Sequence, residues 1–104
     1  MSILVIAEHD GLALKGSTLN TITAAAELGD VTVLIAGDDC DTVASQAAKL
    51  AATNKILVAE DEIYSTPLAE TFTPLILSIA RDFSHILGPA STFGKNILPR
   101  VSAL

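Results

Sequence analysis

Hydrophobic residues gather in four short continuous runs along this chain, separated by longer segments in which hydrophobic and polar residues mix. The runs cover residues 3–7, 31–36, 56–59 and 85–87. Continuous runs are typical of parallel strands that are covered on both faces, whereas half-exposed strands alternate. Their first residues lie 28, 25 and 29 positions apart, which is about the length of a strand–helix unit. The pattern therefore predicts four parallel β-strands connected by helices.

The segments between the runs carry hydrophobic residues at helical spacing. We expect helices that begin near Ser17, Asp41 and Gly94. Proline suits the first turn of a helix and not its interior, so Pro74 predicts a further helix from Pro74 to about Phe83. The expected inward-facing residues are Leu19, Ile22 and Ala26, then Val43, Ala47, Leu50 and Ala51, then Leu75, Ile76, Ile79 and Phe83, and finally Ile97, Leu98, Val101 and Leu104.

These elements predict an α/β fold with three layers, an open, mainly parallel twisted sheet flanked by helices. A length of 104 residues is enough for a single domain. Leu104 occupies an inward-facing position of the last expected helix, and no capping residue follows it. We therefore expect residues 1–104 to be one domain of a longer protein, truncated at its C-terminal end.

The charge and composition exclude several classes of function. Twelve acidic and six basic residues give a net charge of −6, which disfavours binding to nucleic acid. No uninterrupted apolar run reaches the roughly 18 residues that a membrane-spanning helix needs. Met1 and Ser2 lead directly into the first run, so we expect no targeting segment and a cytosolic protein. Cys40 is the only cysteine, which excludes an internal disulfide, and its acidic neighbours are expected to raise the pKa of the thiol.

A ligand site is expected where the strand order reverses, outside the carboxyl ends of the first and fourth strands. The fourth strand leads into GPASTFGKN, residues 88–96. A phosphate-binding loop has four residues between its glycines and Ser or Thr after the lysine; this segment has five, and Asn96 follows the lysine. It is either an anion site at the N-terminus of a helix or an ordinary tight turn. We favour the tight turn, because helix N-termini are common and most of them bind no anion. The candidate residues of a vestigial nucleotide crevice are Glu8, His9, Ser91, Thr92, Gly94 and Lys95.

Three other features have a functional and a structural interpretation. His9 stands between two carboxylates and could serve in acid–base chemistry, or it belongs to a solvated strand end. The acidic clusters at residues 38–41 and 60–62 follow strands, where carboxylates complement a helix dipole more often than they bind a metal. Residues 11–16 form a glycine-flanked connection that is either a lid or a surface loop.

Four segments match those of a known family in order: VIAEH at residues 5–9, LNTITA at 19–24, TPLIL at 73–77 and FGKNILPRV at 93–101. The last segment is the most specific. On these residues the whole chain resembles the N-terminal domain of the alpha subunit of electron transfer flavoprotein.

The resemblance implies an adenine nucleotide alpha-hydrolase-like fold and a heterodimer of alpha and beta subunits that carries one FAD. That flavin takes electrons from dehydrogenases, notably those of acyl-CoA oxidation, and passes them to a membrane quinone oxidoreductase. FAD is held mainly by the alpha subunit's C-terminal domain, which this sequence lacks, and AMP is held by the beta subunit, which shares the fold. We therefore expect a catalytically inactive scaffold domain whose partners are the beta subunit and the missing C-terminal domain.

Two alternatives stay open. One is a freestanding adenine-nucleotide-binding module that uses the crevice between the first and fourth strands. The other is a small hydrolase built on His9. For a bacterial source the resemblance implies a cytoplasmic protein, and for a eukaryotic source with a removed leader it implies the mitochondrial matrix.

Overall fold

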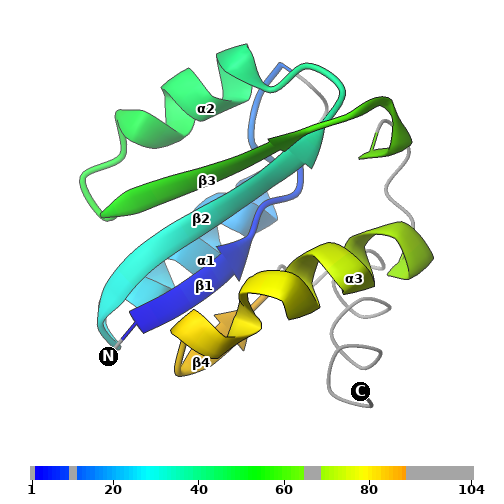
Figure 1. The fold of residues 1–104 in the computed structure, drawn as a ribbon. Helices are drawn as coiled ribbons and strands as arrows, with labels where there is room; N and C mark the ends of the chain where they lie inside the picture. Colours follow the sequence, from blue (N-terminus) through cyan, green and yellow to red (C-terminus); the bar gives the residue numbers. More distant parts are fainter. Residues whose placement is uncertain (1, 10–11, 65–68, 89–104) are drawn as a thin grey trace.

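A computed structural model describes residues 2–9, 12–64 and 69–88 (Figure 1). Each of the four predicted strands corresponds to a strand of the structure. In chain order the elements are β1 (Ser2–Ile6), α1 (Gly16–Ala26), β2 (Asp30–Gly37), α2 (Asp41–Ala48), β3 (Lys55–Glu60), the short 3₁₀ turn η1 (Glu62–Tyr64), α3 (Ala69–Ile79), a second turn η2 (Ala80–Asp82) and β4 (His85–Leu87). The helix predicted near Gly94 lies outside the described residues.

The four strands form one parallel sheet in the order β3-β2-β1-β4. The chain runs outward from β1 through β2 to β3, and then returns to the other side of β1 to form β4. Val5 of β1 is therefore in register with both Val33 of β2 and Leu87 of β4. This confirms the predicted α/β fold and the reversal of strand order between β1 and β4.

Helices cover both faces of the sheet, with α1 and α2 on one face and α3 on the other (Figure 1). Successive residues of a strand point to opposite faces, so a strand between two helical layers must be hydrophobic at every position. The α1/α2 face buries Ile3, Val5, Ala7, Leu14, Ile22, Ala25, Val31, Val33, Ile35, Cys40, Val43 and Ala47. The α3 face buries Leu4, Ile6, Leu34, Ala36, Phe72 and Ile76.

The predicted start of the third helix is wrong, because α3 begins at Ala69 and Pro74 lies inside it. Proline inside a helix removes one backbone hydrogen bond. Phe72, two residues earlier, is 3% exposed, and its ring meets Tyr64 edge to face with centroids 5.4 Å apart. Burial of an aromatic side chain stabilises by a few kcal/mol, so the packing of Phe72 explains why the helix extends through the proline.

The inward-facing positions of the other helices are partly as predicted. Ile22 is buried, but Ala25 rather than Ala26 completes the inner face of α1. In α2, Val43 and Ala47 are buried as predicted, whereas the predicted Ala51 lies beyond the end of the helix and is exposed. The starts of α1 and α2 lie within one residue of the predicted Ser17 and Asp41.

Replacing Pro74 with alanine is expected to raise the free energy of unfolding by roughly 1–3 kcal/mol, because alanine supplies the missing N–H donor and has the highest helix propensity. Pro74 is exposed, so little packing is lost. Urea denaturation followed by circular dichroism measures the change. Pro74→Gly restores the N–H with poor helix propensity and should fall between the two. A destabilised Pro74→Ala variant would contradict the prediction.

Candidate functional site

The carboxyl ends of β1 and β4 lie next to each other, where the strand order reverses. Glu8 follows β1 and Gly88 follows β4. The other residues predicted for this crevice, Ser91, Thr92, Gly94 and Lys95, lie outside the described residues. The anion site therefore stays a prediction, and the structure confirms only that β1 and β4 are neighbouring strands.

Thr18 joins the end of β1 to the first turn of α1. Its side chain is completely buried. The hydroxyl accepts a hydrogen bond from the Glu8 N–H at 2.8 Å and donates one to the Glu8 carbonyl at 3.1 Å. That carbonyl also accepts the Lys15 N–H at 2.9 Å. Thr18 thus bonds both backbone groups of Glu8 where β1 leaves the sheet, so its role is structural.

The sequence contains a signal for this role that the hydrophobic pattern alone missed. Thr18 precedes Ile22 by four positions and Ala25 by seven, so it lies on the inward stripe of α1. A threonine on a buried stripe requires a hydrogen-bond partner for its hydroxyl, and the nearby strand end supplies one.

His9 extends from the end of β1 toward β2, the neighbour on the side opposite β4. Its Nε2 lies 2.8 Å from the carbonyl oxygen of Ala36. A carbonyl only accepts, so Nε2 carries the hydrogen and donates it. The structure thus gives the half-buried His9 ring a role in holding the ends of β1 and β2 together, which favours the structural interpretation over acid–base catalysis.

The close approach of the His9 ring depends on the absence of a side chain at Gly37. A Cβ at this position would lie 3.2 Å from His9 Cε1 and 3.2 Å from Cys40 Sγ. Both distances are tighter than ordinary van der Waals contacts, so a larger residue would displace one of its neighbours. The absence of a side chain at Gly37 therefore allows the His9 ring and the Cys40 thiol to pack against the end of β2.

The loop after β1 is attached to α2. Leu14 is buried, and its N–H donates to the side-chain oxygen of Gln46 at 2.7 Å. His9 and Leu14 also form an antiparallel bridge. These contacts favour a packed surface loop over a lid for residues 12–15.

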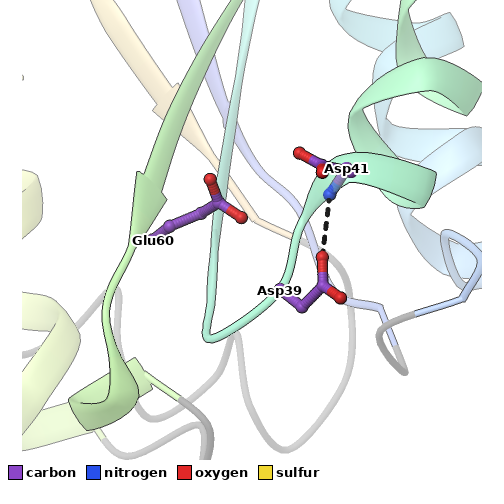
Figure 2. A group of neighbouring side chains, drawn as sticks. All are labelled: Asp39, Asp41 and Glu60. Carbon is purple, nitrogen blue, oxygen red and sulfur yellow. Dashed lines mark hydrogen bonds between the residues drawn. The ribbon is translucent and has the colours of Figure 1, made fainter.

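Three exposed carboxylates, those of Asp39, Asp41 and Glu60, meet where β2 and β3 end (Figure 2). Their nearest oxygens lie within 4.8 Å of one another. Asp39 accepts the Asp41 N–H at 3.4 Å, and Glu60 accepts the Cys40 N–H at 3.1 Å. Both N–H groups are at the start of α2, so the carboxylates cap the helix and complement its dipole, as predicted for the first acidic cluster. The position of Glu60 over α2, rather than over its own η1 turn, was not predicted.

Cys40 lies beneath these carboxylates and is completely buried. Burial, followed by the charges of Glu60, Asp39, Asp38 and Asp41, raises the pKa of the Cys40 thiol. This confirms the predicted direction, although the largest cause is burial rather than the acidic neighbours. A thiol of this kind is a poor nucleophile.

Comparisons with known proteins give one consistent result. The family model described as "Electron transfer flavoprotein domain" matches residues 3–104. The chain is 50% identical to an electron transfer flavoprotein subunit alpha from Pseudomonas aeruginosa and 46% identical to one from Paracoccus denitrificans, in both cases covering 100% of this chain and 34% of the relative. It is 44% identical to a mitochondrial electron transfer flavoprotein subunit alpha from Dictyostelium discoideum, covering 97% of this chain and 31% of the relative.

The chain thus spans about a third of the length of the curated relatives that it matches. Among the described residues, no helix has the length and apolar character that crossing a bilayer requires.

Thr18→Val is expected to lower the free energy of unfolding by about 1–3 kcal/mol, because it removes the hydroxyl partner of the part-buried Glu8 N–H. Urea denaturation measures the loss. Thr21→Val is the matched control: the Thr21 hydroxyl donates to the Ser17 carbonyl within α1, and removing such a bond costs little. Equal effects of the two substitutions would contradict the role given to Thr18.

Cys40 is expected to react with iodoacetamide only at a pH above the ordinary cysteine value of about 8.5, because the thiol and not the thiolate is favoured in the fold. Glu60→Gln removes a negative charge that opposes ionisation, so the midpoint of the rate–pH curve should move down. Glu62→Gln removes an equal charge from the neighbouring turn and should move it less. Alkylation rates measured by mass spectrometry in native buffer provide the test, and an unchanged midpoint in Glu60→Gln would refute it.

Proposed function

Because this chain belongs to the electron transfer flavoprotein domain family and corresponds to the N-terminal part of its alpha subunits, we propose that it is the N-terminal scaffold domain of such a subunit. The observation that carries this proposal is the match to the Pseudomonas aeruginosa subunit along the entire chain. The α/β fold with its parallel sheet agrees with it.

In this proposal residues 1–104 form one domain with a structural role. The domain supports a C-terminal domain that binds FAD, and it packs against a beta subunit that binds AMP. The full heterodimer is an electron carrier rather than a catalyst: it accepts electrons from dehydrogenases, notably of acyl-CoA oxidation, and delivers them to a quinone oxidoreductase. It works in the bacterial cytoplasm or, for a eukaryotic source, in the mitochondrial matrix.

The polar groups at the described end of β1 support a structural role. The Thr18 hydroxyl bonds the Glu8 backbone, and His9 donates to Ala36. Each of these bonds joins one element of the domain to another. They hold the strand ends in place, which is what a scaffold requires.

A second candidate function is the freestanding adenine-nucleotide-binding module. One observation favours it: β1 and β4 are neighbours and the strand order reverses between them, which is where ligands bind in open parallel sheets. Nucleotide binding to the folded state would raise the melting temperature of the chain, and the rise would grow with the logarithm of the nucleotide concentration above Kd.

A chimeric subunit tests the scaffold proposal. This chain replaces the matching N-terminal third of the Pseudomonas aeruginosa alpha subunit, and the chimera is co-expressed with that organism's beta subunit. We expect a heterodimer that purifies with bound flavin, seen in its visible absorption spectrum. Along its whole length this chain is 50% identical to the subunit, which makes it a suitable replacement for that part.

The control is the same alpha subunit with its N-terminal third deleted, which should not form a stable heterodimer. A chimera that folds but behaves like this deletion would refute the proposal. Thermal denaturation of the chain alone with added AMP separates the second candidate: a rise in melting temperature supports the nucleotide module, and no rise supports the scaffold.

A further inference from the structure

We draw no further inference here: the strongest candidate, the cluster of Asp39, Asp41 and Glu60 carboxylates where β2 and β3 end, is already accounted for by its hydrogen bonds to the start of α2, and no second feature of the described residues points to an ion bound there.

Discussion

The arrangement of the whole domain depends on how β1 is held, because β1 is the strand from which the sheet extends in both directions. Its residues from Ile3 to Ile6 are at most 2% exposed, between helices on both faces and strands on both edges. The backbone groups at the end of such a strand still require hydrogen-bond partners. The buried Thr18 hydroxyl bonds both groups of Glu8, and this contact fixes the position of α1 against the sheet.

The strands were predictable because burial on both faces leaves a continuous hydrophobic run, which few other structures produce. The start of α3 was not, since the local preference of Pro74 was outweighed by the burial of Phe72, a tertiary contact. The sequence also did not predict that the Glu60 carboxylate lies close to those of Asp39 and Asp41. These residues are far apart in sequence, and only the parallel register of β2 and β3 brings their ends together.

For the candidate site, the sequence predicted which strand ends are neighbours but not the contacts that their side chains make. Topology alone identified the edge of the sheet where β1 and β4 end. The role of His9 required the structure, because a histidine between carboxylates has the same sequence pattern whether it is catalytic or structural. Its hydrogen bond to Ala36 and its fit against Gly37 show a structural role, and neither contact is local in sequence.

The place of β4 in the sheet also has a kinetic consequence. Ser84, at the start of β4, bonds the carbonyl of Ser2 at the start of β1, 82 residues earlier in the chain. Contacts over such a distance form late, because a long loop must close before they contribute. During synthesis, β1, β2 and β3 can assemble while one edge of β1 is still open. The three residues of β4 then close that edge, so the first strand of the chain is the last to gain its full set of neighbours.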